Sequence, residues 1–183
     1  MKSLSDDINS AGGKEVSIPT AIPSENISCI CIAHQADHFP VKSYSPQDIT
    51  GAFTRIRDRF PEPSFSIRAA LFNVGSASWG PFLSITPEQV RESLETTVVA
   101  GFAFAREAVL QFKQNEIDTV ATLGGKGKRG TLIFTGATAS VRGNTTTSAF
   151  AAAKHGVRAL SQSLAKEFGK DNIHVSRVPH GHT

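Results

Sequence analysis

The stretch Gly130-Thr-Leu-Ile-Phe-Thr135 decides the fold of this 183-residue chain. It is a short run of β-forming residues closed by Gly136, which predicts a buried strand. A helical pattern follows from about Thr147 to Phe168, with Gly169 as its expected stop and apolar residues at helical spacing: Phe150, Val157, Leu160, Leu164 and Phe168. Ile173–Val178 again has the character of a strand. We therefore expect two parallel strands with the helix packed across them.

The same alternation extends upstream. Ser45-Pro46 predicts the start of a helix that stops at Pro61, with an apolar stripe of Ile49, Phe53, Ile56 and Phe60. Ser66–Val74 predicts a strand, and Thr86 with Gln89 predicts the capped start of a long helix bearing Val90, Leu94, Val98, Ala105, Val109 and Phe112. The predicted class is α/β, a Rossmann-type parallel sheet flanked by helices.

Composition excludes several classes of protein. Apolar residues make up 39% and charged residues 19% of the chain, as in one globular domain spanning 1–183. The net charge of +3 falls short of the clustered basic face of a nucleic-acid binder. No apolar run approaches the ~18 residues of a membrane span, and Met1–Asp7 is too polar for a signal peptide. We expect a cytoplasmic protein with neither nucleic-acid nor membrane partners.

Phe150 and Lys154 lie one helical turn apart in Ser148-Ala-Phe-Ala-Ala-Ala-Lys154. A tyrosine at position 150 would set a proton donor beside a lysine on one helix face. Phenylalanine keeps the ring but has no exchangeable proton. The missing hydroxyl therefore bears directly on any acid–base chemistry at this pair.

Three motifs carry a family resemblance: Phe72-Asn-Val-Gly75, the strand and loop Gly130–Ser140, and Phe150-Ala-Ala-Ala-Lys154. From about Pro40 onward, over roughly 140 residues, the chain resembles the short-chain dehydrogenase/reductase family of NAD(P)-dependent oxidoreductases. Its Gly-Ala-Thr-Ala-Ser loop is similar to that of a branch with phenylalanine at the tyrosine position. Three motifs in the family's order make the resemblance specific.

The resemblance implies roles for individual residues. Lys154 would bind the nicotinamide ribose, and Asn73 with Gly75 would line the adenosine side of NAD or NADP. Phe150 occupies the position of the tyrosine that donates a proton to the substrate carbonyl. The position of the carbonyl-holding serine falls at Ala137, with Thr138 or Ser140 supplying a hydroxyl after a small shift in register; that of the water-relay asparagine falls at Thr97.

Only one of these four catalytic groups, the lysine, is clearly retained, which puts catalytic competence in question. The sequence thus predicts an oxidoreductase homologue for a small carbonyl or alcohol, with weakened or lost turnover. A non-catalytic binding subunit is an alternative, joined to itself or relatives through the two long helices as a homo-oligomer. Another is a truncated product without stable function. Arg106 and Glu107 are expected at the surface or a subunit interface.

The first forty residues follow the family less closely. Lys2–Lys14 fits the helix after the family's second strand, so the resemblance implies a chain that lacks the first βαβ cofactor unit. We expect 1–19 to be a remnant of helix and third strand, 20–39 an insertion, and 40–183 the family-like core.

Two further patterns suggest binding sites. Gly125-Lys-Gly-Lys-Arg-Gly130 matches G-x-G-x-x-G, but it precedes a strand, so it predicts a basic loop rather than a phosphate cradle. Cys29, Cys31, His34 and His38 form a possible zinc set. The Cys-x-Cys gap is tighter than usual, so a small zinc module is the weakest alternative, and no metal site is assigned.

Overall fold

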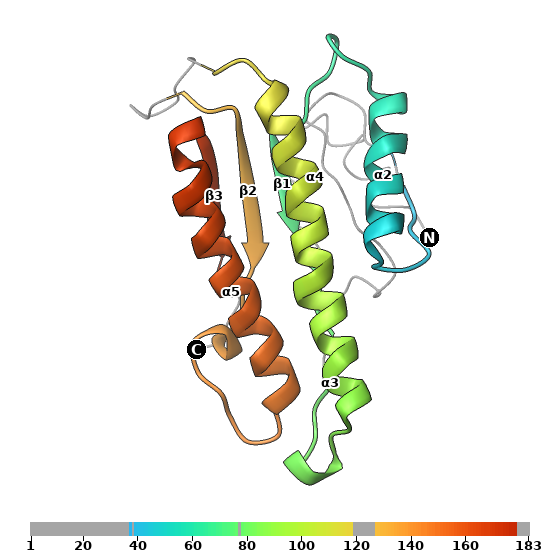
Figure 1. Cartoon of the computed structure of the whole chain (residues 1–183), viewed down its shortest axis with the longest axis vertical. Helices are drawn as coiled ribbons and strands as arrows, with labels where there is room; N and C mark the ends of the chain where they lie inside the picture. Colours follow the sequence, from blue (N-terminus) through green and yellow to red (C-terminus); the bar gives the residue numbers. More distant parts are fainter. Residues whose placement is uncertain (1–36, 38, 77, 119–126, 179–183) are drawn as a thin grey trace, which may run out of the picture.

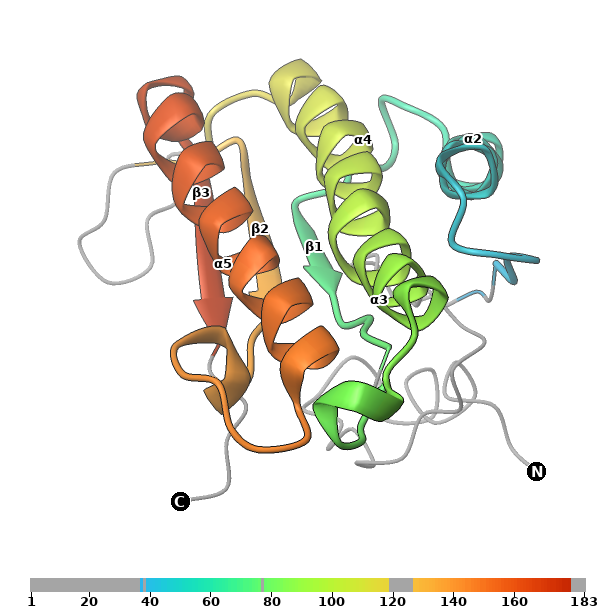
Figure 2. The same ribbon diagram turned by 60° about the horizontal axis from the view of Figure 1, so that its bottom comes forward.

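The computed structural model describes residues 37, 39–76, 78–118 and 127–178. Within these residues the strands β1 (Ala69–Phe72), β2 (Gly130–Thr135) and β3 (Ile173–Val178) form one parallel sheet in the order β1-β2-β3. Two long helices lie side by side across one face of the sheet, and α2 (Pro46–Arg59) packs beside them (Figures 1 and 2). The expected Rossmann-type α/β architecture is confirmed.

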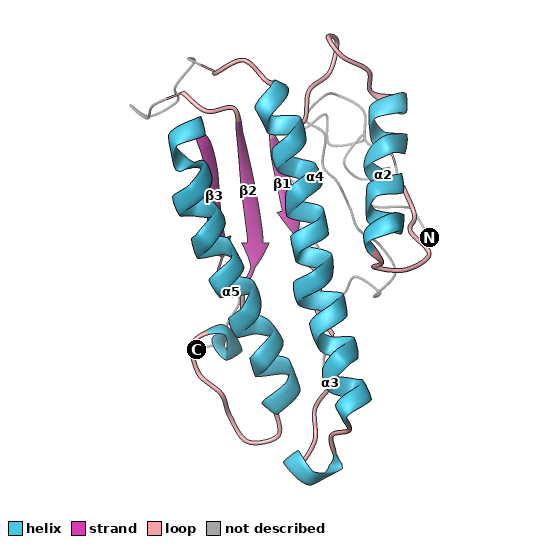
Figure 3. Ribbon diagram, viewed as in Figure 1, coloured by secondary structure: helices cyan, strands magenta, loops and turns pink. Residues whose placement is uncertain are grey.

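The helices begin where their capping residues predict. In α2 (Pro46–Arg59) the Ser45 hydroxyl accepts a hydrogen bond from the Asp48 amide. Thr86 and Gln89 form the expected capping box of α3 (Pro87–Leu94). The long helix then passes through a π-helical turn at Glu95–Val99 and continues as α4 (Ala100–Gln114). Figure 3 shows α3 and α4 as one continuous rod. A π turn widens a helix locally and is frequent at functional sites.

The last helix, α5 (Ser148–Phe168), ends at the predicted residue, but Gly169 does not adopt the left-handed conformation expected of a helix-ending glycine. Gly169 keeps a right-handed conformation and begins a 3-10 turn, Gly169–Asp171. The left-handed residue is Asn172, with φ of 59°. Asparagine tolerates this region better than most residues, so it reverses the chain into β3 in place of the glycine.

The core lies between the sheet and its covering helices. Five phenylalanine rings are almost fully buried there: Phe53, Phe72, Phe104, Phe112 and Phe134. Gly130 opens β2 because a Cβ at this position would lie 2.3 Å from the Phe112 ring. The predicted apolar stripes of α2 and α4 supply most of these contacts.

Glu107 departs from expectation. It is 6% exposed rather than at the surface, because its carboxylate faces α2. There it accepts a hydrogen bond from Thr50 at 3.2 Å and lies 3.8 Å from an Arg57 nitrogen. Helical spacing alone did not predict the burial of Glu107, because α4 is covered by α2 as well as by the sheet.

The expectations for residues 1–36 lie outside the described part of the chain. In the described part, β1 pairs only with β2, and no βαβ unit precedes α2. No helix there combines the length and apolar character needed to cross a bilayer.

Candidate active site

Lys154 is a buried cation at the carboxyl end of β2. It is 7% exposed, and its Nζ donates to the Thr135 carbonyl at 3.2 Å. Burial lowers the pKa of the Lys154 ammonium below its usual value of 10.5, because desolvation disfavours the charged form. Gly75, which follows β1, faces this group: a Cβ there would lie 3.2 Å from Nζ. The structure therefore brings Lys154 and Gly75 together, although the resemblance assigned them to different parts of the cofactor.

Phe150 stands beside this cation. The Lys154 Nζ lies 5.9 Å from the centre of the Phe150 ring. On its other side Phe150 meets Trp79, with ring centroids 5.9 Å apart. Trp79 is 66% exposed, so the pair forms an aromatic wall open to solvent. The Gly80 amide donates to the Thr146 carbonyl at 2.9 Å, which ties the Trp79 loop to the segment before α5.

The loop after β2 separates its two candidate hydroxyls. Ser140 is fully buried, and its Oγ accepts a hydrogen bond from the Ala137 amide at 3.0 Å. The Ser140 amide returns a bond to the Ala137 carbonyl. Thr138 is exposed at the start of the same 3-10 turn, Thr138–Ser140. Ser140 thus closes the turn, while Thr138 faces solvent.

Thr97 lies in the π-helical turn and is 1% exposed. Its hydroxyl accepts a hydrogen bond from the Ser76 amide at 3.4 Å. The turn packs closely on α5, because a Cβ on Gly156 would lie 2.8 Å from Val98. The long helix is therefore joined both to the loop after β1 and to the helix that carries Lys154.

Asn73 follows β1 directly and is exposed. It lies two residues before Gly75, at the carboxyl ends of the parallel strands. Ligands of open α/β sheets bind outside these ends. Asn73, Gly75 and Lys154 therefore share the edge of the sheet where ligands of this fold bind.

Arg177 was not singled out by sequence. It lies on β3 with its Nη1 buried and without a hydrogen-bond partner. A Cβ on Gly136 would lie 2.4 Å from this nitrogen. Gly136 thus leaves room for a second cationic side chain at the carboxyl end of β2. Alternation within the strand gave no signal for this arrangement.

The zinc hypothesis remains untested, because Cys29 to His38 fall outside the described residues except for Asp37. Among the described residues no cluster of three or more histidine, cysteine or acidic side chains could hold a metal ion. The Gly125-Lys126 part of the glycine-rich loop is also outside them.

The chain belongs to the short chain dehydrogenase family, whose model matches residues 24–183. A short-chain dehydrogenase from Rhodopseudomonas palustris shares 30% identity at a TM-score of 0.61, covering 74% of this chain and 56% of that protein. A comparison with curated proteins gives no significant match.

Two more distant structures have the same fold. A putative gluconate dehydrogenase from Agrobacterium tumefaciens has 19% identity and a TM-score of 0.65, over 81% of this chain and 52% of that one. A gluconate 5-dehydrogenase from Burkholderia cenocepacia J2315, in complex with NADP and tartrate, has 15% identity and a TM-score of 0.62, over 76% and 48%. The chain spans about half the length of these three structures.

Proposed function

We propose that the protein is an NAD(P)-dependent oxidoreductase of a small carbonyl or alcohol, with slow turnover because the proton donor is missing. The observation that carries the proposal is the buried Lys154 ammonium, fixed by the Thr135 carbonyl at the carboxyl end of β2. Family membership supports the reaction class. The expected cytoplasmic location belongs to the same proposal.

The described residues fit the nicotinamide end of a dinucleotide. The Lys154 ammonium has three N–H donors and directs one to Thr135, which leaves two for ribose hydroxyls. Gly75 has no side chain to obstruct that approach. Asn73 is assigned to the adenosine side. The NADP bound to the structural neighbour from Burkholderia supports this class of cofactor, either NAD or NADP.

The remaining residues are given positioning roles. A bound nicotinamide would supply or accept the hydride. Phe150 forms a wall and excludes water from the Lys154 side of the cleft. Thr138, with its exposed hydroxyl, is the residue best suited to bond a substrate oxygen, and Ser140 holds the turn that presents it. No group in this set offers a proton from position 150, so solvent must provide it.

Replacing Phe150 by tyrosine tests the proposal. General acid catalysis typically contributes 10²–10⁴-fold in rate, so F150Y should raise kcat/KM by about 10² or more. The assay follows NADPH oxidation with a panel of small aldehydes and ketones. Phe150→Leu is the matched control and should give no gain. Equal rates for F150Y and F150L would overturn the assignment of this site.

A second candidate function is a non-catalytic binding or oligomerisation subunit. The observation in its favour is a groove of about 340 Å³ between α4 and α5, flanked by Phe102 and Leu110, which are 58% and 43% exposed. Apolar exposure of this kind suits a subunit interface. The candidate is a homo-oligomer joined across α4 and α5.

Size-exclusion chromatography with light scattering measures the mass of the protein in solution and so tests the proposed homo-oligomer. Leu110→Glu should dissociate it, whereas Arg142→Glu, on an exposed loop, should not. A monomeric wild-type protein would remove this candidate. A cooperative thermal melt of the wild-type chain would count against the alternative of a product without stable function.

A further inference from the structure

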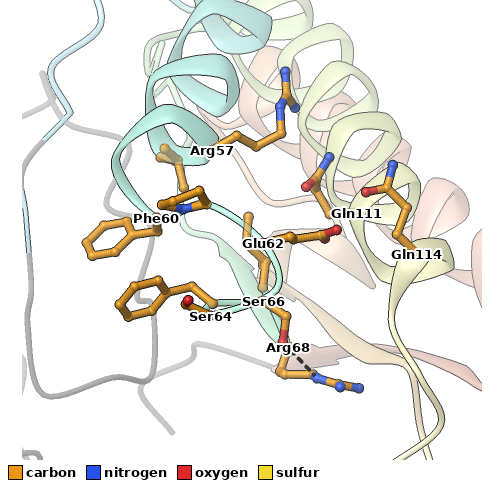
Figure 4. Close-up of a pocket in the computed structure, with 12 residues that line it drawn as sticks. Arg57, Phe60, Glu62, Ser64, Ser66, Arg68, Gln111 and Gln114 are labelled. Carbon is orange, nitrogen blue, oxygen red and sulfur yellow. Dashed lines mark hydrogen bonds between the residues drawn. The ribbon is translucent and has the colours of Figure 1, made fainter.

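A cavity of about 450 Å³ lies at the opposite end of β1 from Gly75. It is formed where α2 ends, where the next loop turns toward β1, and where α4 ends (Figure 4). The volume is within the range of small-molecule sites. Its position, before the first residue of β1, separates it from the cleft around Lys154.

Gln111, on α4, brings an amide group to the cavity. The residue is 8% exposed, and its side chain makes no hydrogen bond to a described residue. Its side chain lines the cavity, as does that of Gln114 one turn further on. Figure 4 shows Gln111 and Glu62 extending toward the same space. Because no described side chain engages this amide, its oxygen and its N–H groups are free to bond a ligand in the cavity.

Arg68 supplies a fixed positive charge. Its Nη1 donates to the Glu116 carbonyl at 2.6 Å and its Nε to the Ser66 hydroxyl at 3.2 Å. These acceptors are neutral, and no carboxylate within the described residues pairs with Arg68. A guanidinium held in this way is prepared to bind a carboxylate.

Glu62 supplies the opposite charge. It lines the cavity, and no lysine or arginine in the described residues forms an ion pair with it. The other cation of the lining, Arg57, is already 3.8 Å from the Glu107 carboxylate. The cavity therefore presents one unpaired cation and one unpaired anion.

The rest of the lining is apolar. Phe60 and Phe65 pack edge to face at 5.3 Å and continue the surface formed by Ile56 and Ile67. A flat or branched hydrocarbon group fits against such a surface.

We infer that this cavity binds a free amino acid with an apolar side chain. Its carboxylate would pair with Arg68 and its ammonium with Glu62. Its side chain would pack against Phe65, and the Gln111 amide would hydrogen-bond its carboxylate or its ammonium. A simple carboxylate or a simple amine uses only one of the two unpaired charges. The site is independent of the dinucleotide proposed at Lys154.

Titration calorimetry with L-phenylalanine tests the inference. Hydrocinnamate lacks the ammonium and phenethylamine lacks the carboxylate, so each should bind at least tenfold more weakly. Glu62→Gln should weaken phenylalanine at least tenfold and leave hydrocinnamate unchanged. Because Glu62 is exposed, this variant should fold. Arg68→Met should weaken both phenylalanine and hydrocinnamate.

Lys154→Met is the control for location and should bind phenylalanine as the wild type does. Absence of saturable phenylalanine binding would overturn the inference, as would equal binding of hydrocinnamate. Loss of phenylalanine binding in Lys154→Met would also overturn it, because the ligand would then occupy the other site.

Discussion

The indole of Trp79 packs against the phenyl ring of Phe150, with centroids 5.9 Å apart and planes inclined by 59°. Trp79 is the single tryptophan of the chain. Its fluorescence therefore reports on Phe150, at the position where the resemblance implies a tyrosine, and on any ligand that binds beside it.

Removal of the Phe150 ring should be visible in this signal. In Phe150→Ala the indole loses its partner and meets more water, so its emission should shift to longer wavelength. Aromatic pairs contribute about 0.5–1.5 kcal/mol beyond their buried area, so the free energy of unfolding should fall by at least that amount. Denaturant unfolding measures it. Phe82→Ala, at a ring 76% exposed, is the control and should change little.

Two glycines should respond oppositely to alanine. In Gly130→Ala the new methyl group would overlap the buried Phe112 ring, so we expect a loss of about 1–3 kcal/mol in stability. In Gly51→Ala nothing lies within 4 Å, and the residue is inside α2. Helix propensity then predicts a gain of up to about 1 kcal/mol. Similar melting temperatures for the two variants would contradict the close approach of Phe112 to β2.

The burial of Lys154 predicts a pH dependence. Its lowered pKa means that the unfolded chain binds more protons than the folded protein between that pKa and 10.5. Stability therefore rises with pH in this window, where the cost of the buried charge is relieved. Lys154→Met does not titrate at this position, so the wild type should gain stability relative to it as the pH rises toward 10.5.

Chemical unfolding at several pH values measures this difference. Lys166→Met, on the exposed side of the same helix, should follow the wild type throughout. A difference between wild type and Lys154→Met that stays flat or narrows with rising pH would show that the ammonium is not desolvated.

Much of the fold was predictable because local rules and tertiary packing agree. Ser45 and Thr86 cap their helices as expected, and Gly130–Thr135 and Ile173–Val178 are strands at the predicted bounds. The strand predicted for Ser66–Val74 is shorter, Ala69–Phe72, since only these four residues pair with β2. Pairing, unlike periodicity, depends on where the neighbouring strand lies.

Features set by contacts distant in sequence could not be predicted. The burial of Glu107 depends on α2 crossing α4, and the π turn around Thr97 gave no local signal. At the candidate site, the close approach of Gly75 to Lys154 was not predicted either. The sequence left Thr138 and Ser140 as equal alternatives, and only the three-dimensional turn distinguishes an exposed hydroxyl from a buried one.

Titration of the purified protein with NADPH and NADP⁺, followed by Trp79 fluorescence, tests the central claim most directly. The account predicts a saturable change, with affinity at least tenfold weaker in Lys154→Met because the ribose loses its cationic partner. Lys166→Met should bind as the wild type does. No saturable change in the wild type, or equal affinity in wild type and Lys154→Met, would contradict the assignment of Lys154 to a nicotinamide cofactor.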